Sequence, residues 1–249
     1  MIRNTGTIAL SILFSGLAVI GRSQELRIDH VITVVADLDS AVNVFNNLGF
    51  SIKRGRLHDN GLLNAHIKFK NNSSFEIMSI TLTPTDEVAK NYAALLKNGE
   101  GAVFLAITGI STNAMIEKLE ALGLGYSRIS GKSWDYITFP ENSSLAHIFF
   151  IDYHIKVDDP NEVLTHRNFT EQLSQVWIEG SDSVRYLFHG LQIQPMEAIT
   201  DPVLGKGNRY STKSGDIIIV PVDNPNLRPR IKMVIFGNRD NSIQIPIRF

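Results

Sequence analysis

The sequence predicts an α+β protein built from repeated βαβββ units. Two observations predict this fold. Runs of β-branched residues alternate with single helices of period about 3.6 residues, and each helix is followed by several short strands. The helix-ending pair Leu-Gly at residues 48–49 also recurs at residues 122–123, which indicates an internal repeat.

The first unit, residues 26–82, shows the pattern most clearly. It is predicted to hold a strand at 28–35, a helix at 38–48 and three strands near 50–55, 63–69 and 74–80. Asp37 is placed to accept hydrogen bonds from the first turn of the helix. Gly49 suits the left-handed residue that ends many helices.

A second unit, residues 100–155, repeats this order, and residues 170–249 form a looser third unit. A separate helix is predicted at about 86–98, and residues 154–168 form a long polar connection that Pro160 keeps from being helical. One unit buries too little apolar surface by itself. We therefore expect residues 24–249 to pack into a single domain.

The first 23 residues have the pattern of a secretory signal peptide: Arg3, an uncharged apolar run at 7–20, and small residues at Gly21 and Ser23. We expect cleavage after Ser23 and export to the periplasm or beyond, with no membrane attachment of the mature protein. The alternative is an uncleaved anchor, although the run is shorter than the roughly 20 residues of a membrane-spanning helix.

Composition excludes several classes of function. The chain has 24 basic and 25 acidic residues and a net charge of −1, which argues against a nucleic-acid partner. It has no cysteine, so disulfides, thiolate metal sites and cysteine nucleophiles are excluded. With 43% hydrophobic residues it can form a large core.

The order of the motifs resembles the vicinal oxygen chelate superfamily, which includes glyoxalase I and extradiol dioxygenases, and most closely its glyoxalase-like branch. The residues that carry the resemblance are Asp29-His30, Asp37-Leu38, Ala41, Leu48-Gly49-Phe50, Gly55-Arg56-Leu57-His58, Gly61, Asn64, Phe75-Glu76-Ile77, residues 149–151 and His166-Arg167-Asn168. The similarity covers roughly residues 26–190, and it implies a glyoxalase/dioxygenase-like fold, in which curved mixed sheets formed by the repeated βαβββ units surround a cleft.

The resemblance also implies a divalent metal, because superfamily members place ligands on the first and fourth strands of each unit. Carried over, the ligands are His30 and Glu76 from the first unit and His147 from the second, where Phe104 takes the place of His30. The assignment of His147 comes from aligning residues 145–151, which include an expected strand at 146–151, with residues 74–80. An imidazole and carboxylate set suits Zn, Fe, Mn or Ni.

Further candidate residues line the same expected cleft. Glu76 and His58 are the candidate catalytic residues, and Asn64, His166 and Asn168 are the candidate substrate-binding residues. Each has a structural alternative: the segment around His58 is also an ordinary turn signal, and a polar loop is also what solvent favours.

The resulting hypothesis is an exported, metal-dependent lyase or isomerase acting on a small carbonyl compound. The first alternative is a metal-free protein of the same fold that binds or sequesters a small molecule, which Phe104 favours. The second is an exported protein whose cleft serves a partner protein or polysaccharide. In this superfamily units pair within a chain or between chains, so a homodimer is a further expectation.

Overall fold

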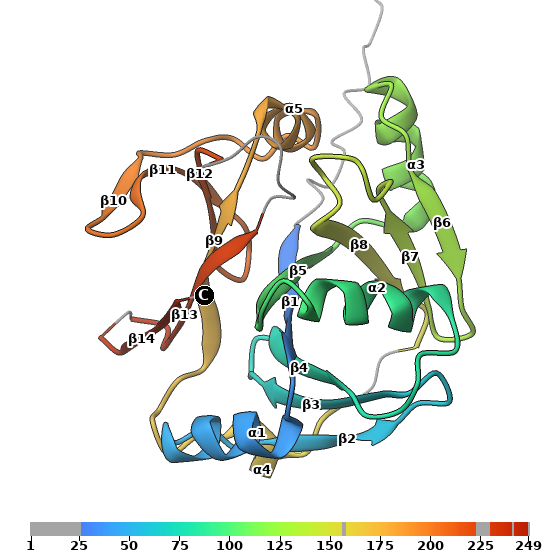
Figure 1. Ribbon diagram of the computed structural model, residues 1–249. Helices are drawn as coiled ribbons and strands as arrows, with labels where there is room; N and C mark the ends of the chain where they lie inside the picture. Colours follow the sequence, from blue (N-terminus) through green and yellow to red (C-terminus); the bar gives the residue numbers. More distant parts are fainter. Residues whose placement is uncertain (1–25, 156–157, 223–229, 241, 249) are drawn as a thin grey trace, which may run out of the picture.

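The computed structural model describes residues 26–155, 158–222, 230–240 and 242–248, and it contains two β-sheets covered by helices (Figure 1). The larger sheet has the strand order β2-β3-β4-β1-β5-β8-β7-β6, and the smaller has the order β10-β11-β12-β9-β13-β14. The predicted α+β class with mixed sheets is confirmed. The signal-peptide prediction falls on residues outside the described part of the chain.

The βαβββ order occurs three times. The first unit holds β1 (Arg27–Val35), α1 (Leu38–Asn47), β2 (Lys53–Leu57), β3 (Leu62–Lys68) and β4 (Ser74–Ile80). The second holds β5 (Gly101–Thr108), α3 (Thr112–Ala121), β6 (Ser127–Ser130), β7 (Trp134–Thr138) and β8 (Ile148–Tyr153). The third holds β9 (Gln172–Glu179), α5 (Asp182–Gly190), β10 (Ile199–Asp201), β11 (Gly205–Ser211) and β12 (Asp216–Val220).

Local sequence explains where the helices begin. Asp37, Asp86, Ser111 and Ser181 each accept a hydrogen bond from a backbone N–H in the first turn of the helix that follows, which satisfies a donor with no partner inside the helix. One of these helices, α2 (Glu87–Leu96), lies between the first two units. No helix among the described residues is long and apolar enough to cross a membrane.

The first two units join edge to edge. Within each, the first strand pairs in parallel with the last, as β1 does with β4 and β5 with β8. Strands β1 and β5 then pair antiparallel and make one continuous sheet. In the smaller sheet β9 pairs antiparallel with β13 (Ile231–Gly237), as β1 does with β5. Strand β13 in turn pairs with β14 (Gln244–Arg248) at the edge of this sheet.

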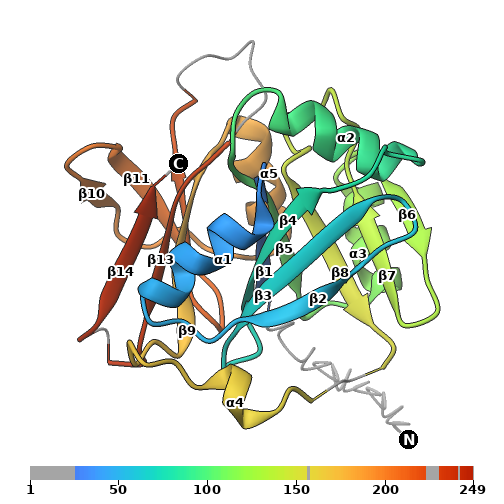
Figure 2. The ribbon, with the colours of Figure 1, turned by 60° about the horizontal axis from the view of Figure 1, so that its bottom comes forward.

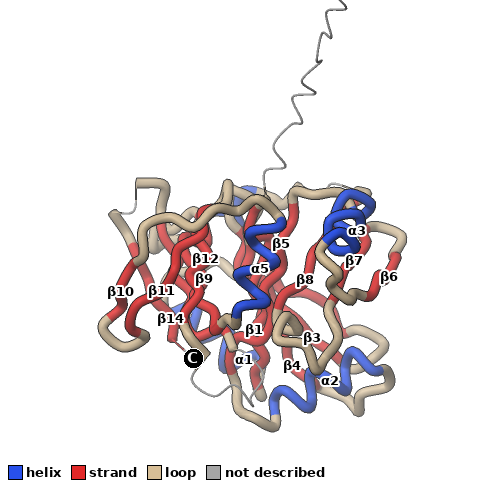
Figure 3. The backbone as a smooth tube through the Cα atoms, turned by 90° about the horizontal axis from the view of Figure 1, so that it is seen from above, coloured by secondary structure: helices blue, strands red, loops and turns tan. Residues whose placement is uncertain are grey.

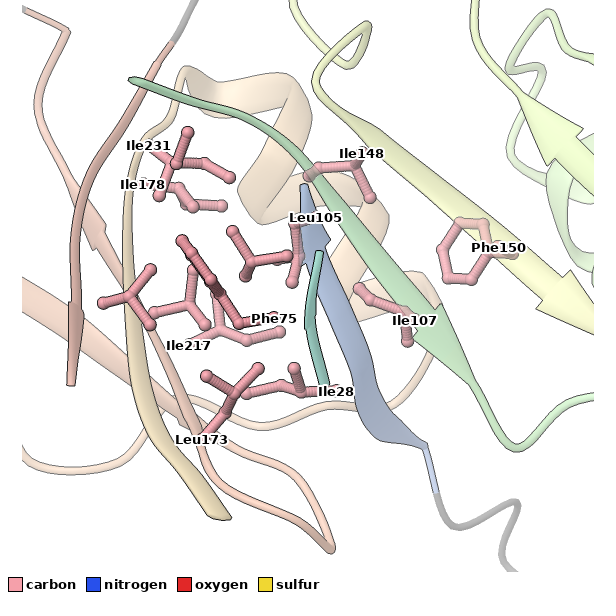
Figure 4. Close-up of a cluster of buried hydrophobic side chains, with 14 of the residues drawn as sticks. Ile28, Phe75, Leu105, Ile107, Ile148, Phe150, Leu173, Ile178, Ile217 and Ile231 are labelled. Carbon is pink, nitrogen blue, oxygen red and sulfur yellow. The ribbon is translucent and has the colours of Figure 1, made fainter. Parts of the chain in front are cut away.

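The main core lies between the two sheets, which stand side by side when seen from above (Figure 3). Fully buried side chains from β4, β5, β9 and β12 meet there, including Phe75, Leu105, Leu173 and Ile217 (Figure 4). Helix α1 lies across the junction of the sheets (Figure 2), and its Phe45 contacts both Phe75 of β4 and Phe236 of β13.

The opposite face of the larger sheet is concave and partly filled. Figure 1 shows α2 lying inside the curve of this sheet, and a second apolar cluster joins the two. Ala89 and Tyr92 of α2 contact this cluster, and Tyr92 packs edge-on against Phe104 of β5 at 5.6 Å between ring centroids. Only the part of the concave face beyond α2 is left for a ligand.

Several observed elements differ from those that the sequence predicts. Strands β10, β11 and β14 and the short helix α4 (Asn161–Leu164) were not predicted, and Pro160 begins α4 as its N-cap, where it was expected to prevent a helix. Strand β8 begins at Ile148, two residues later than expected, and this shift matters for the site.

Candidate functional site

Polar side chains from three neighbouring strands gather on the concave face of the first unit. His30 on β1 and Glu76 on β4 share this face with the apolar residues Ile32 and Met78. An irregularity in the β1–β5 pairing between Ile28 and His30 interrupts the strict alternation of faces. His30, Asn64, His66 and Glu76 form a largely buried cluster on this face, which we call the polar wall.

Asp29 orients the imidazole of His30. The Nδ1 of His30 lies 2.5 Å from the Asp29 carboxylate, and both side chains are about nine-tenths buried, at 10% and 9% exposed. The hydroxyl of Tyr153 on β8 donates to the same carboxylate oxygen at 2.9 Å. At the other end of the same ring, the Nε2 of His30 lies 3.7 Å from a carboxylate oxygen of Glu76.

Asn64 holds the other side of the polar wall in place. Its Nδ2 group donates to the Oε1 of Glu76 at 2.7 Å and to the Nε2 of His66 at 3.2 Å, and its Oδ1 accepts from the backbone N–H of Arg56. A Cβ on Gly55 would lie 1.8 Å from that Oδ1, so this contact requires glycine at position 55. Asn64, predicted to bind substrate, has its hydrogen-bonding groups engaged by the protein.

His66 is a member of this wall that was not predicted from the sequence as a site residue. It stands directly opposite Glu76 in the β3–β4 pairing. Burial lowers the pKa of His66 to about 4, and attraction to Glu76 offsets only part of this effect. The imidazole is therefore neutral at physiological pH. Its position two residues after Asn64 on an alternating strand is the signal that could have identified it.

The second unit supplies an aromatic wall, which we define as Phe104, Trp134, Tyr136 and Phe149. Phe149 of β8 packs edge-on against His30 at 5.5 Å between ring centroids, and Tyr136 and Phe104 pack against Phe149. Burial and the nearby carboxylates of Glu76 and Asp29 raise the pKa of Tyr136, so its hydroxyl stays protonated. The hollow therefore has one polar and one aromatic side.

The three expected metal ligands do not come together. No three His, Asp or Glu side chains among the described residues form a group that could hold a metal ion. The pairing of Leu105 with Ile148 places His147 beside Phe104, because β5 and β8 run parallel. Because Phe104 corresponds to His30, His147 corresponds to Ser74, and Phe149 corresponds to Glu76.

The assignment of His147 as a ligand is therefore corrected. The assignment rested on a sequence alignment of residues 145–151 with residues 74–80, and the strand pairings show that this alignment is two residues out of register. His147 is fully buried one residue before β8 begins. His30 and Glu76 together are half of a metal site, and the second unit adds an aromatic ring where the other half would lie. The residues present do not fit the expected metal.

The structure gives His166 a role in holding the chain together. Its Nδ1 accepts from the backbone N–H of Ser51 at 3.0 Å, its Nε2 donates to the carbonyl of Lys68 at 3.0 Å, and its ring packs between Phe50 and Phe69. The side chain is 3% exposed, and burial lowers its pKa. These contacts engage both nitrogens, so they leave none for a substrate.

Asn168 forms a hydrogen bond with the C-terminal end of helix α1. Its Nδ2 donates to the carbonyl of Leu48 at 2.8 Å, and the neighbouring Arg167 donates from its side chain to the carbonyl of Asn46. Carbonyls at a helix C-terminus lack partners inside the helix, and this segment supplies them. Asn168 thus lies outside the polar wall.

His58 also lies away from Glu76. It follows β2, and its backbone N–H donates to the carbonyl of Leu62 at 2.7 Å. Leu62 pairs with Ile80, whereas His66 pairs with Glu76, so His58 stands four residues along the sheet from the polar wall. That separation is about 13 Å at the usual rise of a strand.

Comparisons with known proteins agree with this fold. A family model described as "Glyoxalase-like domain" matches residues 28–189, which is more than half of the chain. A hypothetical protein from Staphylococcus aureus is similar in structure, with a TM-score of 0.59 and 12% identity over 87% of this chain and 92% of that chain. No curated protein matches.

Two further structures are similar over part of their length or of this chain. A xylose isomerase-like TIM barrel/4-hydroxyphenylpyruvate dioxygenase fusion protein has a TM-score of 0.57 and 10% identity over 84% of this chain and 36% of its own. Methylmalonyl-CoA epimerase from Mycobacterium tuberculosis has a TM-score of 0.41 and 22% identity over 51% of this chain and 88% of its own. At these identities the likeness shows the fold alone. The family match confirms the resemblance seen in the sequence, and the chain belongs to the glyoxalase-like domain family.

Proposed function

We propose that this protein binds a small molecule in its concave face without a metal ion. The observation that carries the proposal is the contact between Phe149 and His30, because an apolar ring stands at the position that corresponds to Glu76. A hollow with one polar and one aromatic wall suits a compact ligand with an oxygen-bearing end and an apolar body.

The two walls offer different contacts to such a ligand. The Nε2 of His30 and the Oε2 of Glu76 face the hollow, and Asp29 and Asn64 hold them in fixed orientations. Side chains that are already ordered lose little entropy on binding, which favours affinity. Tyr136 and Trp134, which pack against each other at 6.2 Å, offer a surface on which a flat apolar group can lie.

The test is a binding screen on the purified protein by NMR, with small neutral aromatic and carbonyl compounds as probes. The proposal predicts chemical-shift changes centred on His30, Glu76 and Phe149, and weaker binding to Glu76→Gln. The matched control is Glu117→Gln on the exposed side of α3. Binding that maps elsewhere, or that is equal in both variants, contradicts the proposal.

A metal measurement decides between this proposal and the metalloenzyme. Elemental analysis of protein purified without chelator or nickel affinity resin, before and after incubation with Zn, Mn, Ni or Fe(II), should give far less than one metal per chain. Near-stoichiometric metal that disappears in His30→Ala would overturn the metal-free proposal.

A second candidate is an enzyme of the lyase or isomerase type, and the orientation of Glu76 favours it. Asn64 engages one oxygen of this carboxylate, and the other lies 3.7 Å from the Nε2 of His30, beyond hydrogen-bonding distance. A carboxylate in this position can remove a proton next to the carbonyl group of a bound substrate. The measurement is solvent deuterium exchange into bound carbonyl compounds, which Glu76→Gln should abolish.

Export and self-association belong to the same proposal. The N-terminal pattern supports export, and N-terminal sequencing of the protein recovered from cells tests for cleavage after Ser23. The first two units pair with each other within one chain, which supports a monomer. Sedimentation equilibrium tests this against the homodimer that the sequence also suggested.

A further inference from the structure

Two lysines stand on the concave face beside the polar wall. Lys53 is directly opposite His66 in the β2–β3 pairing, and Lys68 lies two residues after His66 on β3. Both side chains therefore leave the sheet on the same face as His66 and Glu76. They are half-buried, at 40% and 27% exposed. Both charges also act on His66 and help to lower its pKa.

A single carboxylate lies between these lysines. Asp159 forms an ion pair with Lys53, and its second oxygen is 4.0 Å from the ammonium group of Lys68. Its side chain is only 16% exposed. The lysines are fixed by two paired strands, whereas Asp159 comes from the connection between β8 and α4.

The other two carboxylates near the polar wall contact groups other than the lysines. Glu76 accepts from Asn64 and faces His30, and Asp29 accepts from His30 and Tyr153. The lysine pair is thus a place where ammonium groups bind a carboxylate beside the polar wall, and the group bound there belongs to the protein itself.

We propose that the ligand of the concave face is a small organic acid, and that Asp159 occupies the place of its carboxylate when no ligand is bound. This inference rests on the proposed function and names the class of ligand. The acid group would replace Asp159 between Lys53 and Lys68, and the rest of the molecule would extend toward His30 and Phe149.

The dimensions of the sheet fit such a molecule. Lys68 pairs with Ser74, and Ser74 pairs with His30, so these three residues lie in one row across β3, β4 and β1. Two strand spacings separate the first from the last, which is about 10 Å. An acid with one flat ring reaches along most of that row from the lysines toward Phe149, which contacts His30.

The experiment compares an acid with its uncharged analogue. The probes are phenylacetate, phenylacetamide and inorganic phosphate, and their dissociation constants are measured by NMR titration at low ionic strength. We expect Asp159→Asn to bind phenylacetate at least tenfold more tightly than the wild type and to bind phenylacetamide equally. Adding Lys68→Met to Asp159→Asn should abolish this gain in affinity for phenylacetate. The gain in affinity should also become smaller as the salt concentration is raised.

The matched control is Lys90→Met, which removes an exposed lysine on α2 that pairs with Glu87. It should leave the binding of all three probes unchanged. Circular dichroism and the unfolding temperature of each variant establish that the fold is retained.

The remaining outcomes contradict the inference in distinguishable ways. Equal affinity of Asp159→Asn for the acid and the amide removes the organic-acid claim and leaves small-molecule binding standing. Phosphate bound more tightly than phenylacetate would make the lysine pair a phosphate site. Absence of phenylacetate binding to Asp159→Asn also overturns the inference, whereas the proposed function is then judged separately by neutral probes and Glu76→Gln.

Discussion

Phe149 of β8 packs edge-on against His30 of β1, with 5.5 Å between ring centroids, at the position that corresponds to Glu76 in the first unit. The first unit of the sheet thus brings a histidine and a carboxylate to the hollow, and the second unit brings an aromatic ring. This asymmetry between two units of the same topology separates a polar wall from an aromatic wall, and it supports ligand binding without a metal.

Replacing that ring should create a metal site. In Phe149→His a second imidazole would lie beside His30 and Glu76, which gives the three protein ligands typical of an open zinc site. We expect loss of the buried ring to cost roughly 3 kcal/mol of stability and added zinc to raise the unfolding temperature of the variant. Zinc should have no such effect on the wild type or on the double variant His30→Ala, Phe149→His. An equal effect of zinc on the wild type would contradict the assignment.

His166 should matter for stability and not for binding. Its alanine variant loses hydrogen bonds to Ser51 and Lys68 and leaves space between Phe50 and Phe69. We expect the free energy of unfolding to fall by roughly 3 kcal/mol in urea titrations, with ligand affinity unchanged in the folded protein. Lost affinity at unchanged stability would restore the substrate-binding role that the sequence suggested.

The burial of His66 predicts a pH-dependent stability. Its pKa is about 4 in the folded protein and 6.5 in the reference state, so the unfolded chain binds more protons between these values. Stability is therefore greatest above pH 6.5 and falls as the pH drops toward 4, by on the order of 3 kcal/mol from this group.

The comparison is with His66→Gln, whose unfolding free energy should decline less over the same pH range. Buried His166 contributes in the same direction in both proteins, so the difference between the two curves isolates His66. Parallel curves for wild type and variant would show that His66 titrates normally.

The hydroxyl of Tyr153 should position His30 through Asp29. Although Tyr153 is 46% exposed overall, its hydroxyl donates to Asp29, and burial and the charge of Asp29 raise its pKa. In Tyr153→Phe we expect a stability loss of about 1 kcal/mol and several-fold weaker ligand binding. A change in the nitrogen chemical shifts of the His30 ring distinguishes positioning from a general loss of stability. Tyr186→Phe, on the exposed side of α5, is the control.

Much of the fold could be predicted because its signals are local. The helices α1, α2 and α3 were expected from apolar residues at helical spacing, and the observed caps at Asp37 and Ser111 are short-range contacts. The candidate site was predictable to the same extent. Alternation along single strands placed His30 and Glu76 on the concave face, where the structure has them.

The predictions that failed concern residues whose roles depend on contacts between distant segments. The roles of His166 and Asn168 follow from their contacts with Lys68 and Leu48, about 100 residues earlier, and nothing near them in sequence reveals these partners. The filling of the hollow by α2 and the position of Asp159 between two lysines are likewise products of packing.

The sequence by itself determined where most strands of the first two units lie and which side chains of one strand share a face. The tertiary structure alone decided which residues of different strands stand opposite each other. Side chains alternate with a period of two, so a shift of one residue moves every side chain to the other face and is visible in the pattern. A shift of two residues preserves the face and leaves no trace in the pattern, and such a shift separates His147 from Phe149.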